Sequence, residues 1–120
     1  MGQYETLLYE ERNGVAWVTL NRPQVHNAFN AQMQRELFEL WRGLRRNDDV
    51  RAVVLTGAGD KAFCTGIDRT ETMGAKPAEG ADKPLIGRAS TPFMFDDPGA
   101  NIGPKSCDLW KPVIAAVNGM

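Results

Sequence analysis

The residues from 55 to 71 read Leu-Thr-Gly-Ala-Gly-Asp-Lys-Ala-Phe-Cys-Thr-Gly-Ile-Asp-Arg-Thr-Glu and carry the most information in this sequence. They predict a strand, a glycine-rich turn and a helix start, because Asp68 and Glu71 match a capping pattern. Such a turn can point backbone N–H groups outward, where they stabilise a developing negative charge. A purely structural interpretation also fits: the glycines supply turn angles, and Asp68 caps the helix for about 1 kcal/mol.

The same segment contains Gly57, Gly59 and Ala62 after a strand, which satisfies the Gly-x-Gly-x-x-Ala fingerprint of dinucleotide-binding folds. That fingerprint needs glycines that open a helix directly and an acidic residue about 20 positions further on. Here residues 63–66 intervene, and Asp82 falls in a region rich in proline and glycine. A dinucleotide-dependent oxidoreductase is therefore an alternative with weak support.

Two β-prone runs, residues 6–11 and 15–20, are predicted to be strands. Asn13-Gly14 between them favours a type I′ hairpin, since both residues tolerate positive φ. The second run ends in Asn21-Arg22-Pro23. Because proline has no N–H to continue a ladder, a loop is expected there.

A helix capped by Asn30 is predicted next, because its apolar residues recur on one face: Met33, Leu37, Leu40, Trp41 and Leu44. Residues 52–55 form a short apolar run without alternation, which indicates a strand covered on both faces of a parallel sheet. Strand, helix and strand in this order predict a right-handed βαβ crossover and an α/β fold.

The last third of the chain has less regular signals. Residues 74–105 hold five of the seven prolines and five glycines, which predicts a long loop that either lines a substrate or is only pinned to the surface. Residues 107–110 fit the end of a short helix, and residues 113–117 fit another buried strand. Since nothing after Met120 could cover such a strand, we expect the chain to be a fragment of a larger domain.

Composition argues against several classes of function. The 120 residues have a formal net charge of −1 and no basic run, so neither nucleic acid nor an anionic membrane is an expected partner. Without a long apolar span or a signal pattern, a cytoplasmic protein is expected. Cys64 and Cys107 are expected to be reduced and buried, with no disulfide or zinc site. A single histidine, His26, gives little support to a metalloenzyme or a Ser/His/Asp hydrolase.

Four segments occur in a familiar order along nearly the whole chain: Trp17-Val18-Thr19-Leu20-Asn21-Arg22-Pro23, His26-Asn27-Ala28-Phe29-Asn30, residues 53–68, and Lys111-Pro112-Val113-Ile114-Ala115-Ala116-Val117-Asn118-Gly119. Together they resemble the crotonase (enoyl-CoA hydratase/isomerase) family. The resemblance implies an α/β crotonase-like spiral of ββα units, with residues 1–120 as its incomplete N-terminal part. Residues 74–105 lie outside the resemblance and are longer than in simple members.

By that resemblance, the backbone N–H of Ile67 is one of two donors to the thioester carbonyl of an acyl-CoA, and the second follows Gly119 beyond Met120. The side chain of Ile67, where many relatives have alanine, would narrow the acyl pocket. Asp68, Asn27 and Asn30 are interpreted as helix-start, turn and cap residues. The residues implied to contact the acyl-CoA are Val25, His26, Ala28, Ala62, Cys64, Thr65, Gly66, Ile67 and Asp68.

The activity that the resemblance implies is that of an enoyl-CoA hydratase, a lyase of fatty acid metabolism that adds water across a trans-2-enoyl-CoA. Isomerase, decarboxylase and thioester hydrolase are alternatives within the family, and a non-catalytic acyl-CoA or subunit-contact module is another. Half of an oxyanion hole should be nearly inactive by itself.

The acid and base glutamates of the hydratases would lie later in the chain. The glutamates present are interpreted as solvated carboxylates: Glu5, Glu10, Glu11, Glu36, Glu39, Glu71 and Glu79. Coenzyme A is part of the substrate, so neither a separate cofactor nor a metal is implied. The family also implies assembly as a homotrimer or homohexamer.

Overall fold

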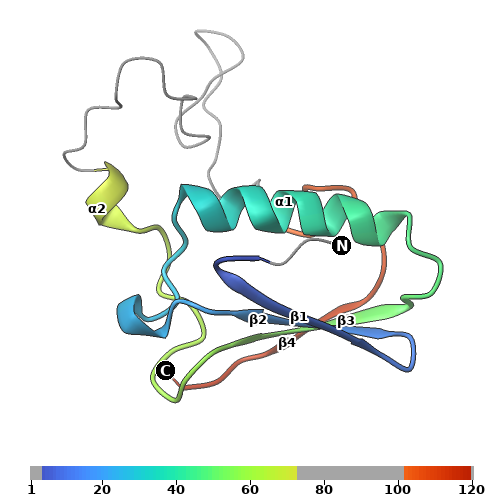
Figure 1. Ribbon diagram of the computed structural model, residues 1–120, viewed down its shortest axis with the longest axis horizontal. Helices are drawn as coiled ribbons and strands as arrows, with labels where there is room; N and C mark the ends of the chain where they lie inside the picture. Colours follow the sequence, from blue (N-terminus) through green and yellow to red (C-terminus); the bar gives the residue numbers. More distant parts are fainter. Residues whose placement is uncertain (1–3, 73–101, 120) are drawn as a thin grey trace, which may run out of the picture.

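The computed structural model describes residues 4–72 and 102–119, which form a sheet with one long helix on one of its faces (Figure 1). The four strands within these described residues lie side by side in chain order in a single sheet. The elements are β1 (Leu7–Arg12), β2 (Val15–Leu20), the 3-10 helix η1 (Pro23–Val25), α1 (Ala31–Arg45), β3 (Ala52–Gly57), α2 (Arg69–Thr72) and β4 (Val113–Ala116).

The predicted hairpin is confirmed. β1 and β2 pair antiparallel, from Leu7 opposite Leu20 to Arg12 opposite Val15. Asn13 has φ 53° and Gly14 has φ 80°, and a type I′ turn requires positive φ at both positions.

α1 begins at the predicted cap, where the Asn30 side chain accepts a hydrogen bond from the Met33 N–H at 2.9 Å. Its apolar face packs on the sheet, and Trp41, 0% exposed, donates its indole N–H to the Ile102 carbonyl at 2.8 Å. This bond attaches the last described segment to the helix. The predicted helix and its buried face are therefore both confirmed.

Glu36 on α1 corrects one expectation, because it is a buried carboxylate, only 5% exposed. It accepts hydrogen bonds from the Thr6 N–H at 2.9 Å and from the Thr6 hydroxyl at 3.0 Å. Burying a carboxylate without such partners would be strongly unfavourable, so this pair joins the start of β1 to the helix.

The predicted βαβ unit is present, since β2 and β3 pair in parallel with Val15 opposite Ala52. β4 continues the sheet as a second parallel neighbour of β3, with Val53 opposite Val113. Long-range parallel pairing thus places the ends of β3 and β4 at the same edge of the sheet. The loops that follow these two strands consequently lie together.

The prediction of burial on both faces is wrong for residues 113–117 of the described chain, whereas no residue of β3 is exposed. Ile114 is 58% exposed and Val117 is 68% exposed. Successive side chains of a strand point to opposite faces, so Ala16 and Val53 pack in the core below α1 while their neighbours point away from it. In the part of the chain that the structure describes, no helix covers that second face.

Residues 104–108 form consecutive turns, so the helix end predicted for 107–110 is wrong. The Leu109 N–H donates to the Pro104 carbonyl at 2.9 Å. Donor and acceptor are therefore five residues apart, whereas an α-helical hydrogen bond joins residues four apart. Cys107 is buried as predicted, whereas Cys64 is only half-buried, and no disulfide joins the two. Most of the loop predicted for 74–105 lies outside the described residues. Within those residues, no helix is long and apolar enough to cross a membrane.

Candidate functional site

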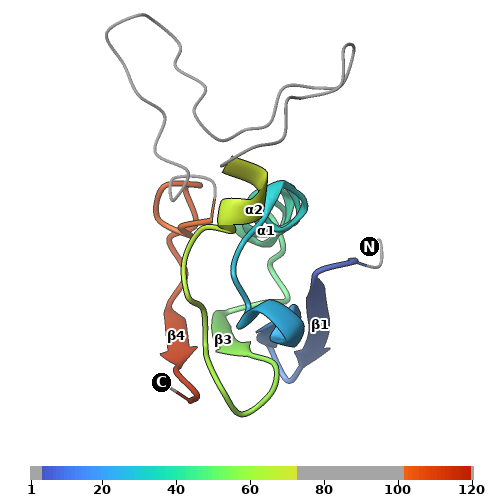
Figure 2. The ribbon, with the colours of Figure 1, turned by 90° about the vertical axis from the view of Figure 1, so that its left-hand side faces the viewer.

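A loop of residues 58–68 connects β3 to α2 and lies beside η1 (Figure 2). Asn27, which is 0% exposed, joins the two segments. Its side-chain oxygen accepts from the Arg22 N–H at 2.8 Å, and its amide nitrogen donates to the Ala58 carbonyl at 3.0 Å and the Ala62 carbonyl at 2.9 Å. Because oxygen and nitrogen are both used within the protein, Asn27 is a structural turn residue, as predicted.

The backbone N–H of Ile67 points away from Phe29, the residue to which this part of the loop is hydrogen-bonded. Phe29 and Ile67 form a parallel bridge, in which the Phe29 N–H donates to the Gly66 carbonyl and the Asp68 N–H donates to the Phe29 carbonyl, both at 2.9 Å. A trans peptide holds its C=O and N–H on opposite sides. Since the Gly66 carbonyl faces Phe29, the Ile67 N–H faces the opposite direction. No hydrogen bond within residues 4–72 and 102–119 uses this donor.

Gly66 makes this orientation possible. Its φ of 99° lies in a region that residues with a side chain rarely adopt. The chain can therefore turn sharply just before the bridge and present the next N–H group outward.

Arg22 fixes the far end of the loop. Its guanidinium donates to the Asp68 carboxylate at 3.0 Å and to the Ala28 carbonyl at 2.6 Å. Asp68 also accepts from the Thr70 hydroxyl at 2.7 Å and the Thr70 N–H at 3.0 Å, which makes it the predicted cap of α2. The Thr70 donors, followed by Arg22, hold the pKa of Asp68 below its ordinary value although burial opposes this shift. Asp68 is thus a structural carboxylate.

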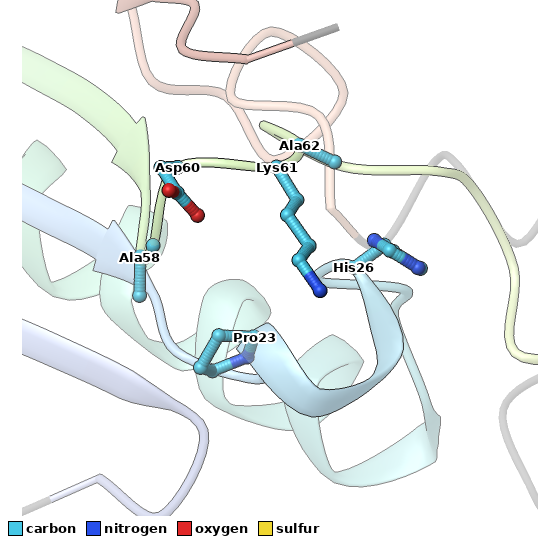
Figure 3. A pocket seen from close by; sticks show the side chains of 7 residues that line it. Pro23, His26, Ala58, Asp60, Lys61 and Ala62 are labelled. Carbon is cyan, nitrogen blue, oxygen red and sulfur yellow. The ribbon is translucent and has the colours of Figure 1, made fainter.

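A pocket of about 130 Å³ lies between η1 and the start of the loop (Figure 3). Figure 3 shows the Lys61 ammonium group extending towards Pro23 and His26. Typical ligand pockets exceed roughly 300 Å³, so this pocket holds at most one group of a larger molecule. The lining residues are Pro23, His26, Ala58, Gly59, Asp60, Lys61 and Ala62.

The end of β4 is attached to the same loop. The Asn118 side chain accepts from the Gly57 N–H at 3.0 Å and donates to the Gly59 carbonyl at 2.9 Å. Gly119 then bridges to Ala62, with φ 66° and so little space that an added Cβ would overlap the backbone of residues 61–62. Only glycine fits at this contact, and the chain leaving β4 passes directly beside the loop that carries Ile67.

The residues predicted to contact a ligand fall into two neighbouring groups. In the first group, His26 and Ala62 line the pocket, and Val25 is the last residue of η1, next to His26. The second group is held by Arg22 and the bridge to Phe29, and contains Ala28, Gly66, Ile67 and Asp68. Cys64 and Thr65 lie on the loop between them, outside the pocket.

Arg22 and Lys61 belong to this region although the sequence does not predict them for the site. Arg22 contacts Asp68, 46 positions away, so no local pattern could reveal the pair. Lys61 could have been suspected as a cation immediately after a glycine-rich turn.

The geometry does not match a dinucleotide fingerprint. β3 ends at Gly57, residues 58–68 form an extended loop, and α2 begins only at Arg69. The glycines therefore do not open a helix against which a pyrophosphate could lie. Within the described residues, no cluster of His, Cys, Asp or Glu is arranged to hold a metal ion.

Comparison with known proteins gives consistent matches. The family model described as enoyl-CoA hydratase/isomerase matches residues 10–120. The (E)-benzylidenesuccinyl-CoA hydratase of Thauera aromatica is 37% identical over 110 residues, which are 92% of this chain and 38% of that protein. A probable enoyl-CoA hydratase of Rhodobacter capsulatus is 40% identical over 116 residues, which are 97% of this chain and 39% of that protein.

A solved structure agrees with these relatives. The crystal structure of an enoyl-CoA hydratase/isomerase from Mycobacterium paratuberculosis matches with a TM-score of 0.75 and 33% identity, covering 98% of this chain and 42% of that one. The present chain thus spans 38–42% of the length of these three proteins. Its mixed α/β sheet and helix are those of the crotonase fold. The chain belongs to the enoyl-CoA hydratase/isomerase (crotonase) family and corresponds to its N-terminal part.

Proposed function

We propose that this chain supplies the first half of an acyl-CoA site in which the Ile67 N–H donates to the thioester carbonyl oxygen. The observation that carries the proposal is the direction of the Gly66–Ile67 peptide, whose carbonyl is bonded to Phe29 and whose N–H is left pointing outward. The carbonyl oxygen of a thioester gains negative charge when the thioester is converted to its enolate. A fixed backbone donor stabilises that charge without having to reorganise.

The second donor of this oxyanion hole is proposed to follow Gly119. The bridge between Gly119 and Ala62 supports this, because it holds the end of β4 against the loop that carries the first donor. Two peptide N–H groups from these segments could converge on one oxygen. Removing one donor from such a hole typically costs roughly 3 kcal/mol of transition-state stabilisation.

The coenzyme A part of the substrate is proposed to lie along Val25, His26 and Ala28 on one side and residues 62–68 on the other. The pocket beside η1 would take one polar group of it. Position 25 is valine in this chain and offers no positive charge to a phosphate. Lys61 lines the pocket and offers a cation from the opposite wall, suited to a phosphate.

For the complete protein we propose enoyl-CoA hydratase activity, with assembly as a homotrimer or homohexamer in the cytoplasm. Two relatives whose names state a hydratase activity support this choice of reaction. Isomerisation and decarboxylation also form an enolate, and thioester hydrolysis also places negative charge on the carbonyl oxygen, so the same donors suit all of these reactions and the reaction itself has to be measured.

The test is to mix the whole protein with a short trans-2-enoyl-CoA and to follow the enoyl absorbance and the product mass. Hydration removes the absorbance and adds one water. Release of free CoA thiol would instead indicate a thioester hydrolase, and a shifted double bond with unchanged mass would indicate an isomerase. Tight CoA binding without any of these reactions would favour the non-catalytic module, and NAD(H) binding without CoA binding would overturn the proposal.

The role of Ile67 is tested separately by replacing the Gly66–Ile67 amide with an ester, which removes the N–H but keeps the side chain. We expect turnover to fall about a hundredfold or more. An ester at the exposed residue Asp48, in the turn that follows α1 and outside the candidate site, is the matched control and should retain turnover within a few-fold. Equal losses for both esters would contradict a donor role for Ile67.

A further inference from the structure

A groove of about 220 Å³ lies at the C-terminal end of α1, lined by Arg42, Gly43, Arg45 and Arg46. Figure 1 shows that this end of α1 is the one remote from α2. Since each helical residue rises about 1.5 Å, the groove lies roughly 20 Å from the cap Asn30. It is therefore separate from the candidate acyl-CoA site.

Three exposed arginines line this groove. Of these three arginines, only Arg45 has an ion-pair partner within the described residues: Asp108, at 3.9 Å. The Arg42 guanidinium lies over the ring of Phe38 at 4.6 Å from its centre, a contact that orients the group without neutralising it. The groove thus has more positive than negative charge.

The helix dipole alone does not account for this arrangement. It explains why arginines occur in the last turn of a helix. It does not explain Gly43, which is exposed inside α1, has no positive φ, and would meet no atom within 4 Å if it carried a Cβ. Glycine destabilises a helix interior relative to alanine, and no packing contact among the described residues requires it here. The missing side chain does, however, leave the groove open between the arginines.

We propose that this groove binds a small anion of the diphosphate type. Guanidinium groups form pairs of parallel hydrogen bonds with phosphate oxygens, which a point charge cannot do. The lining contains no apolar side chain for a base or an acyl chain, so the phosphates are the part that is recognised. A stable protein interface typically buries roughly 800 Å² and 20–30 residues per partner, whereas four residues line this groove, so a small anion fits it better than an acidic protein.

Titration calorimetry with inorganic diphosphate tests the proposal on the wild-type protein. Saturable binding with a dissociation constant below about 1 mM is expected, weakened at least about tenfold in Arg42→Gln/Arg46→Gln. Arg35→Gln/Arg51→Gln removes the same charge outside the groove and should change affinity less than about threefold. Equal weakening in both double variants, or no saturable binding by the wild type, would overturn the site.

Gly43→Leu tests the shape of the groove at constant charge. Leucine should be tolerated because space is free at this position, and it should weaken diphosphate binding at least about tenfold while the melting temperature is kept. Unchanged affinity in a folded variant would reject the groove as the binding site. Coenzyme A also contains a diphosphate, so competition by CoA that disappears in Arg42→Gln/Arg46→Gln would identify a second CoA molecule as the source, and its absence would identify another phosphate ester.

Discussion

At the scale of single residues, Asp68 links two contacts that hold the loop in place. Its carboxylate caps α2 through Thr70 and pairs with Arg22, and the side chains of this pair are only 9% and 15% exposed. Breaking a pair that is shielded in this way leaves the other charge without compensation. For Asp68→Asn we therefore expect the free energy of unfolding at pH 7 to fall by about 2 kcal/mol.

The stabilisation that Asp68 provides should depend on pH. The pKa of Asp68 is lower in the folded protein than in the unfolded chain. Its stabilisation is consequently present above the ordinary carboxyl pKa of about 3.9 and is lost as the pH falls through the folded value. Urea unfolding at several pH values should show the gap between wild type and Asp68→Asn closing in acid. Asp48→Asn, at an exposed position, is the control, and a gap independent of pH would contradict the assignment.

The contribution of Lys61 to ligand affinity should depend on whether the ligand carries a phosphate. If its ammonium group contacts a phosphate of coenzyme A, Lys61→Ala should raise the dissociation constant for CoA about fivefold, as expected for an exposed charge pair. The effect should shrink at high salt and vanish for pantetheine, which carries no phosphate. Lys105→Ala, also exposed, is the control. An equal loss for pantetheine would show that Lys61 acts through the shape of the loop.

At the scale of elements, the loop of residues 58–68 is fixed by two asparagine side chains. Asn27 is fully buried and has φ 58°, whereas Asn118 is only half-buried. We expect Asn27→Ala to lower the free energy of unfolding by about 3 kcal/mol, because it leaves buried polar groups unpaired and puts alanine into a left-handed conformation. Asn118→Ala should cost about 1 kcal/mol, since water can replace its bonds.

Thermal and urea unfolding of the two variants measure this difference. Asn27→Gly provides the control for backbone strain and should recover about 1 kcal/mol of the loss. Equal losses for Asn27→Ala and Asn118→Ala would show that the burial of the first does not determine its contribution.

At the scale of the whole molecule, the sequence predicts the elements and, from their order, the βαβ unit, but it does not predict which side chains of distant segments contact one another. The hairpin and the capped helix follow from signals within a few residues of each other. The contact between Arg22 and Asp68 joins positions 46 apart, and that between Asn118 and Gly59 joins positions 59 apart. The apolar pattern of residues 113–117 indicates a strand whose side chains favour burial on both faces. It cannot report which segment covers it, and no described helix does.

The uncovered face of the sheet has a defined row of side chains. Trp17 is in register with Val54, which is in register with Ile114, so the three residues lie across β2, β3 and β4 on the face away from α1. Trp17 is 37% exposed and Ile114 is 58% exposed. Contiguous apolar surface of this kind is rare on soluble monomers because water makes it unfavourable.

We therefore expect the 120-residue chain to bind a hydrophobic dye and to self-associate at micromolar concentration. Trp17→Lys/Ile114→Lys should yield a monomer in sedimentation velocity with unchanged far-ultraviolet circular dichroism, because charges on the face oppose stacking of two sheets. Gln24→Lys/Ser106→Lys adds the same charge at exposed positions elsewhere and should still associate. If the wild-type chain sediments as a monomer and does not increase the fluorescence of the dye, this face does not mediate self-association. Its apolar side chains would then be tolerated in contact with water.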